Sequence, residues 1–153
     1  MNIFIKGGKY LSAFILSCVL VTVLCVPLTS ASYLIWLNSV DMPISWGIVI
    51  QSISHDYVNF SPIFFLVSLL AFICSFMMAS ALYLPFRNTN LISLELTYGL
   101  AAAFGLQFAI YLSIELLFGT QLIAGNRVLV GKIFHFVFAF ISGYIFGSLI
   151  KKI

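Results

Sequence analysis

Charged residues are scarce in this chain, and their scarcity excludes most classes of soluble protein. Asp, Glu, Lys and Arg together make up 7% of the 153 residues, whereas hydrophobic residues make up 63%. An ordinary soluble domain carries about 25% charged residues, so a soluble fold could not cover its surface with the charges present here. Lipid is therefore the expected solvent for most of the chain, and the lipid bilayer is its first expected partner.

Sequence motifs that carry chemistry are missing as well. The chain contains no phosphate-binding loop, dinucleotide fingerprint or nucleophile elbow. Cys18, Cys25 and Cys74 form no C-x-x-C pair, and the two histidines have no third ligand at a spacing suited to a metal ion. No basic stripe is present that could bind nucleic acid. We therefore expect no metal, no cofactor and no nucleic-acid partner, and we find no positive sign of an enzyme.

What the chain does have is a series of four apolar segments. The uncharged runs are 10–40, 57–86, 96–114 and 133–150. A helix needs about 20 predominantly apolar residues to cross the hydrocarbon of a bilayer. We therefore expect a single all-α integral-membrane domain over 1–153, with four transmembrane helices at about 10–37, 60–84, 94–118 and 128–150.

The first segment also has features of a cleavable signal peptide. Lys6 and Lys9 precede its apolar run, and the small residues Thr29 and Ala31 have the spacing of a −3 and −1 pair before a cleavage site. However, the apolar character continues through 33–37, as expected of a helix that crosses the whole membrane. We interpret the segment as a transmembrane helix and keep a cleaved leader as the alternative.

Pro27 and the loop after it determine the expected shape of the first half. Pro27 removes one backbone hydrogen bond from the first span, and Thr29, Ser30 and Ser32 are expected to satisfy the freed carbonyl groups. In the loop, apolar residues recur at helical spacing between positions 46 and 57, which predicts a short amphipathic helix in the outer interface. A short strand over 44–50 is the alternative.

The start of the second span has its own signal. Ser61 is followed at once by Pro62. Serine is a preferred N-cap, and proline is favoured at the first helical position. We expect Ser61 to cap the second span and Pro62 to begin it.

Small residues recur every fourth position along the last two spans. They are Ser93, Thr97, Ala101, Gly105, Ala109 and Ser113 in the third, and Gly131, His135 (the exception in size), Ala139, Gly143 and Gly147 in the fourth. Helices in lipid associate by close backbone approach over small side chains. We expect a tight antiparallel hairpin of the third and fourth spans, in which Gly105 faces Gly143.

Polar and ionisable side chains gather toward one end of this expected hairpin. Glu115 would lie level with Lys132 and His135. One interpretation is structural: Glu115 pairs with Lys132 or Arg127, and Arg87 pairs with Glu95 at the other end. The other is an outward-facing polar pocket, whose candidate residues are Gln107, Tyr111, Glu115, Arg127, Lys132 and His135.

Three functions fit these features. The absence of chemical motifs favours a non-catalytic accessory or assembly subunit, which binds another membrane protein. Pro27 and the polar pocket indicate instead a small transporter or ion-coupled carrier, which would be a homo-oligomer because four helices enclose little space. A membrane enzyme acting on a lipid or quinone would depend on Tyr111, Glu115 and His135. The accessory subunit is the function that the sequence favours.

The basic residues predict an orientation that labelling can test. With four spans, both termini and the link at Arg87 share a side, and Lys6, Lys9, Lys151 and Lys152 lie on that side too. Basic residues accumulate in the cytoplasm, so we expect an inner-membrane protein with both termini inside and residues 38–59 outside. An impermeant thiol reagent added to intact cells should label Ser45→Cys and not Asn88→Cys. The reverse pattern would invert the topology.

Overall fold

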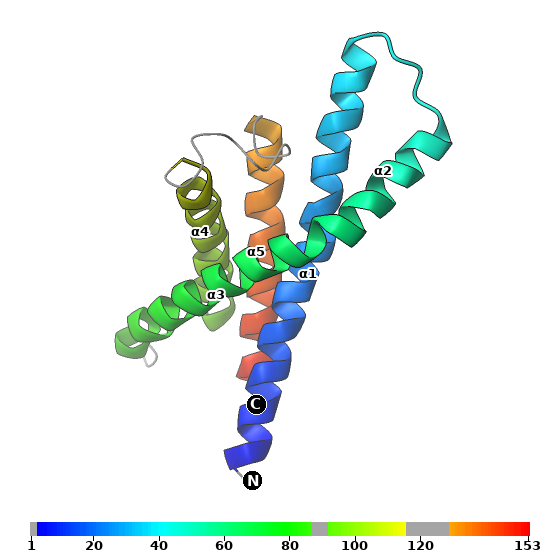
Figure 1. Ribbon diagram of the computed structural model, residues 1–153. Coiled ribbons are helices and arrows are strands. Elements are labelled where there is room, and N and C mark those ends of the chain that lie inside the picture. The colour runs from blue at the N-terminus through cyan, green and yellow to red at the C-terminus, as the bar shows by residue number, and fades with distance from the viewer. Residues whose placement is uncertain (1–2, 87–91, 116–128) are drawn as a thin grey trace.

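The protein is all-helical. The computed structural model describes residues 3–86, 92–115 and 129–153, with side chains described over 5–85, 92–112 and 129–153. The described helices are α1 (Ile3–Ser39), α2 (Trp46–Asn59), α3 (Ser61–Tyr83), α4 (Leu94–Glu115) and α5 (Leu129–Lys151), with a single 3₁₀ turn, η1 (Leu84–Phe86), after α3 (Figure 1). The four long helices coincide closely with the four predicted segments, and α2 is the helix predicted in the first loop.

Three of the long helices have the length and composition of membrane spans. They are α1 from Ile5 to Ser39, α3 and α5. α4 is not among them on its described residues. The expectation of a multi-pass membrane protein is therefore supported, whereas the fourth predicted span is not confirmed.

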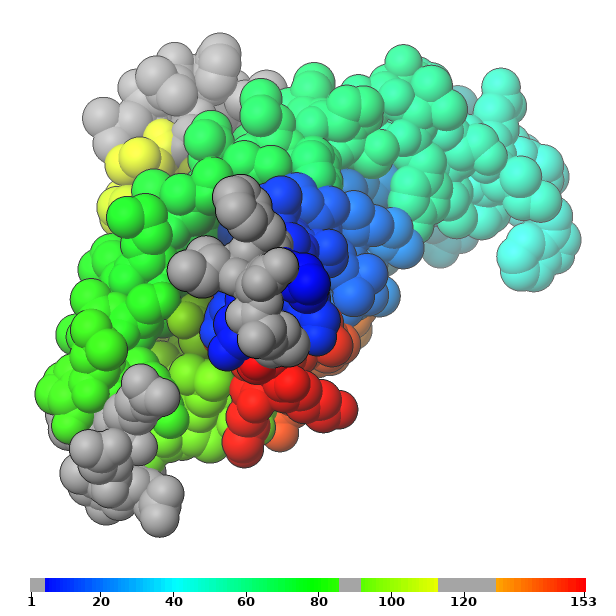
Figure 2. All heavy atoms as spheres, turned by 90° about the horizontal axis from the view of Figure 1, so that it is seen from below, coloured from blue at the N-terminus to red at the C-terminus, as the bar shows by residue number. Residues whose placement is uncertain are grey.

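The four long helices form a bundle. α5 packs between α4 and α1, and α3 contacts both α1 and α4. α4 and α5 run antiparallel, α3 crosses the bundle obliquely, and both chain ends lie at the same end of the molecule (Figure 1). α2 and the adjoining segment after α1 extend beyond the bundle (Figure 2). This arrangement leaves α2 in contact with only α1 and α3 among the described helices.

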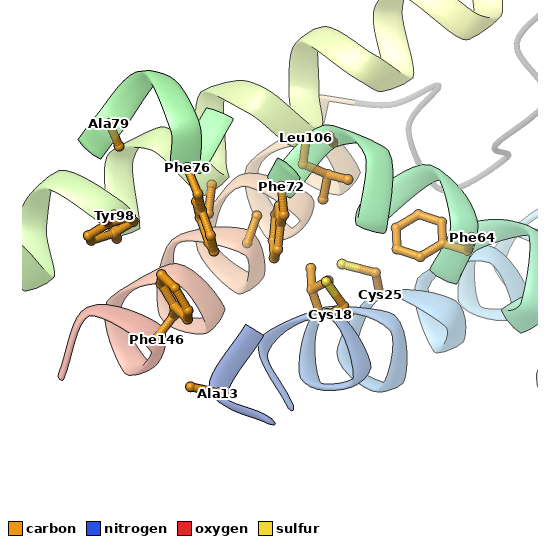
Figure 3. Close-up of a cluster of buried hydrophobic side chains, with 14 of the residues drawn as sticks. Ala13, Cys18, Cys25, Phe64, Phe72, Phe76, Ala79, Tyr98, Leu106 and Phe146 are labelled. Carbon is orange, nitrogen blue, oxygen red and sulfur yellow. The ribbon is translucent and has the colours of Figure 1, made fainter. Parts of the chain in front are cut away.

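An aromatic cluster joins the four long helices. The ring of Phe76 from α3 stacks on Phe146 from α5 at a centroid separation of 4.6 Å, and the ring of Tyr98 from α4 meets Phe76 edge-on at 5.2 Å. Phe14 from α1 contacts the edges of both phenylalanines. Figure 3 shows these α3, α4 and α5 rings turned toward one another. Edge-on and offset pairs each stabilise by about 0.5–1.5 kcal/mol beyond their burial.

The α4–α5 hairpin forms, but its predicted register is wrong. A side chain on Gly143 would meet the Tyr98 carbonyl and the Ala102 methyl, and one on Gly147 would lie 2.7 Å from the Cα of Glu95. Gly143 and Gly147 therefore lie opposite α4 residues one to two turns earlier than expected. Gly105 instead faces α3, where a Cβ would lie 2.6 Å from the Cβ of Ser75.

The predicted cap of the second span is also wrong. Ser61 does not act as N-cap, because Phe60 occupies that position and the Ser61 hydroxyl donates to the Tyr57 carbonyl. Backbone hydrogen bonds from Phe60 to Asp56 and from Phe64 to Phe60, 2.9 and 3.0 Å long, continue across the junction. α2 and α3 are thus nearly one helix, and the alternative of a strand over 44–50 is excluded.

The glycine contacts predict which glycine substitutions the hairpin tolerates. Gly143→Ala places a methyl group against the backbone of α4, which cannot yield as a flexible side chain can. We expect a loss of about 1–3 kcal/mol, seen as a lower melting temperature in detergent. Gly8→Ala is the matched control, because nothing lies within 4 Å of its added Cβ. Equal melting temperatures for the two variants would contradict the observed register.

Candidate functional site

The structure describes only some of the residues of the predicted polar pocket. The Gln107 side-chain amide donates to the Lys132 carbonyl at 3.0 Å, which joins α4 to α5. Tyr111 and Lys132 are exposed, whereas His135 is 0% exposed. The side chain of Glu115 and the whole of Arg127 lie outside the described residues, so the predicted Glu115 pairing is not tested.

His135 is held in the core by its own helix. Its Nδ1–H donates to the Gly131 carbonyl at 2.7 Å, and its ring lies 6.1 Å from that of Phe64 on α3. Its Nε2 is buried and has no hydrogen-bond partner among the described residues. Gly131 and Ala139, one turn on either side, are buried too, so this part of the α5 stripe packs inward.

Glu95 has a different ion-pair partner from the expected one. Lys151 Nζ lies 2.6 Å from Glu95 Oε1, which joins the start of α4 to the end of α5. The Glu95 side chain is 12% exposed and that of Lys151 is 62% exposed. Arg87, the partner predicted from the sequence, lies outside the described residues. The pair neutralises a largely buried carboxylate at the end where Gly147 brings the two backbones close.

Tyr57 satisfies the backbone group that Pro27 leaves unpaired. Proline has no N–H, so the Val23 carbonyl, four residues earlier, has no donor within α1. The Tyr57 hydroxyl on α2 donates to this carbonyl at 2.8 Å. The expectation that Thr29, Ser30 and Ser32 would satisfy it is wrong. Ser30 donates to Asp56 and Ser32 to the Leu28 carbonyl, and Thr29 Oγ1 is buried without a partner among the described residues.

A polar groove lies between α1 and α2, just beyond this contact. Its volume is about 410 Å³, and its lining residues are Thr29, Ser30, Tyr33, Ile48, Gln51, Ser52, His55 and Asp56. The Ser30 hydroxyl donates to Asp56 Oδ2 at 2.6 Å, and His55 Nδ1 lies 3.7 Å from Oδ1. We refer to this feature as the α1–α2 groove. The sequence alone does not show that α2 folds back on α1, so this groove was not predicted.

A second groove, larger and apolar, lies between α3 and α4. Its volume is about 770 Å³, and residues of both helices line it, among them Ser75, Met78, Thr97, Ala101, Phe104 and Gly105. Thr97, Ala101 and Gly105 are the central members of the predicted α4 stripe. They therefore border this α3–α4 groove instead of facing Gly143 and Gly147.

Ser75 is exceptional among the serines of α3. Ser68 and Ser80 each donate to the carbonyl four residues earlier. Ser75 is 9% exposed, lines the α3–α4 groove, and its hydroxyl has no hydrogen-bond partner among the described residues. A buried hydroxyl without a partner costs free energy, so the groove contains one polar group that is not satisfied within the described part of the chain.

Neither groove has the features of a metal centre. No three His, Cys, Asp or Glu side chains in the described ranges are close enough to hold a metal ion.

Comparison with known proteins gives no family for the chain. No protein-family model, curated protein or solved structure matches it. Functional inference therefore depends on the geometry of the two grooves.

The contact between Tyr57 and Pro27 predicts a specific coupling. Tyr57→Phe leaves the Val23 carbonyl without a donor and should lower the free energy of unfolding by about 1 kcal/mol. Pro27→Ala restores the N–H that bonds this carbonyl within α1. In the Pro27→Ala background, Tyr57→Phe should therefore cost almost nothing, as a double-mutant cycle in detergent can measure.

Tyr10→Phe is the control for the loss of a tyrosine hydroxyl, since Tyr10 is 44% exposed and no hydrogen bond joins it to another side chain in the described part of the chain. It should leave stability unchanged in both backgrounds. Additive effects of the Tyr57 and Pro27 substitutions would mean that the hydroxyl does not serve the Val23 carbonyl.

Proposed function

We propose that this protein is a non-catalytic accessory or assembly subunit of the cell inner membrane, and that a transmembrane helix of its partner protein docks in the α3–α4 groove. One observation carries the proposal: a lateral apolar groove that is bordered by small residues and contains a buried serine hydroxyl without a partner among the described residues. Each of these properties has a reason in the physics of helix association in lipid.

The small residues of the groove favour a helix as the occupant. Helices in a bilayer gain little from burying apolar surface, so they associate where small side chains let backbones approach. Thr97, Ala101 and Gly105 lie on one face at four-residue spacing and border the groove. Along α4 they extend over about two turns, which suits a helix that crosses α4 at an angle.

Ser75 supports a protein occupant over an acyl chain. A hydrocarbon chain cannot accept or donate a hydrogen bond, and it would leave the buried hydroxyl unsatisfied. A partner helix can supply a backbone carbonyl or a polar side chain. Phe104 and Phe108, which are 62% and 64% exposed, would form an aromatic wall beside it.

The proposal includes the topology expected from the sequence. We treat α4 as the fourth span, since it lies antiparallel against α5 and shares its level (Figure 1). Both chain ends then lie on the cytoplasmic side, and α2 lies outside. The end that holds the termini also holds the Glu95–Lys151 pair, in keeping with the basic character of cytoplasmic ends.

A small oligomeric carrier remains the alternative function, favoured by the buried and unpartnered Nε2 of His135. Ionisable groups within a membrane commonly mark ion pathways. In such a carrier the α3–α4 groove would receive a second copy of the chain instead of a different protein. The identity of the helix in the groove therefore separates the two functions.

Site-specific photo-crosslinking in native membranes tests the proposal. A benzophenone amino acid at Met78, an exposed residue of the groove, should yield one discrete protein adduct whose mass is not a multiple of the 17.0 kDa chain. Ala101→Leu fills the groove and should reduce this adduct at least tenfold. The same probe at Val137 on α5, outside the groove, should not form it.

Ala81→Leu is the matched control, because it adds the same atoms to an exposed position of α3 that does not line the groove. It should leave the adduct unchanged. An adduct of twice the mass of the chain would favour the oligomeric carrier. Crosslinking to lipid alone would refute docking of any helix in this groove.

A further inference from the structure

Among the described residues, no Lys or Arg pairs with the Asp56 carboxylate in the α1–α2 groove. The Asp56 side chain is 20% exposed, and the sequence has no Lys or Arg from position 10 to position 86. Among the described residues, the two side chains near its oxygens are Ser30, which donates a hydrogen bond, and His55, which is 70% exposed and 3.7 Å away. A largely buried carboxylate is costly unless a cation or further donors compensate it.

The other side chains around Asp56 favour an organic cation. Tyr33 lines the groove, and its ring stacks on that of Trp36 at a centroid separation of 6.2 Å and an interplanar angle of 27°. An aromatic ring beside a carboxylate is a common arrangement for binding an ammonium group. A calcium ion would require six to eight oxygen ligands, and the groove offers a single carboxylate.

Thr29 indicates which kind of ammonium group fits. Its hydroxyl oxygen is buried, lines the groove and has no partner among the described residues. Gln51, on the facing helix, also lines the groove and adds an amide oxygen. A primary ammonium has three N–H donors, which match one carboxylate, one hydroxyl and one amide oxygen. A quaternary ammonium has none and would leave the Thr29 hydroxyl unsatisfied.

We propose that the α1–α2 groove binds a primary ammonium group of the ethanolamine type, with Asp56 as counter-ion, Thr29 as hydrogen-bond acceptor and Tyr33 as aromatic wall. The group can belong to a phospholipid headgroup or to a free amine, because both present the same chemistry. The volume of about 410 Å³ lies within the range of small-molecule sites.

The position of the groove suits both sources. α1 has 37 residues, which corresponds to roughly 55 Å at 1.5 Å per residue, whereas the hydrocarbon is about 30 Å thick. Part of α1 must therefore lie in the headgroup region or in water. The last turns of α1 extend beyond the start of α5 (Figure 1). This proposal does not depend on the docking of a helix in the α3–α4 groove.

Tryptophan fluorescence in nanodiscs tests the proposal. Trp46→Phe leaves Trp36, which stacks on Tyr33, as the single reporter. In discs of phosphatidylglycerol, which contain no amine, ethanolamine hydrochloride should produce a saturable change that equal concentrations of sodium chloride do not. Asp56→Asn should weaken this binding at least tenfold, while its side-chain oxygen can still accept from Ser30.

Two further variants separate binding from folding. Thr29→Val preserves the shape of the side chain and removes the acceptor, so it should weaken binding several-fold even if Asp56→Asn fails to fold. Asp41→Asn is the control, because Asp41 lies between α1 and α2 but does not line the groove. This variant should bind ethanolamine as tightly as the unsubstituted protein does.

Replacing phosphatidylglycerol by phosphatidylethanolamine in the discs identifies the source of the amine. If discs of phosphatidylethanolamine abolish the response to added ethanolamine, the lipid headgroup occupies the groove; if the response is equal in both discs, the ligand is a free amine. Either result supports the proposal. No saturable change in phosphatidylglycerol, or equal binding by the parent, Asp56→Asn and Thr29→Val, would refute it.

Discussion

The close approach of α5 to the first turns of α4 is the contact on which the other helix positions depend. Gly143 and Gly147 have no side chains, so the two backbones meet at the level of Tyr98 and Glu95. At that level the ring centroids of Tyr98 and Phe146 are 5.0 Å apart. Phe76 of α3 and Phe14 of α1 pack against these two rings. In lipid, where apolar burial contributes little to association, such a contact determines the geometry of the bundle.

The oblique crossing of α3 explains why the molecule has two unlike grooves. Because α3 follows α2 almost without interruption, its direction is tied to that of α2. The apolar groove lies beside the contact between α3 and α4, where Ser75 meets Gly105. Near the junction of α2 and α3, the same rod brings Asp56 and Tyr57 to α1. One groove therefore borders lipid-facing surface, and the other is lined by polar side chains.

The helices of this fold could be predicted from the sequence, but the face with which each helix packs against its neighbours could not. Uncharged runs and turn residues are local signals, so α1, α3, α4 and α5 lie where expected. The α4 stripe of small residues indicated a packing face, but spacing does not identify the neighbour, and Gly105 contacts Ser75 instead of Gly143. The α1–α2 groove was missed although one signal was present, since Asp56 lies in a stretch without Lys or Arg. Joining that signal to Thr29 and Tyr33 requires knowledge of how α2 folds back on α1.

The bond from Tyr57 to the Val23 carbonyl has a consequence for how the chain is made. α1 is synthesised before α2. Until Tyr57 has been translated, the Val23 carbonyl that Pro27 leaves unpaired therefore lacks its hydrogen-bond donor. A backbone group without a partner is unfavourable inside the bilayer, so until α2 emerges α1 is better accommodated with that carbonyl near water or within the insertion machinery. Folding of the first loop thereby completes the insertion of the helix that precedes it.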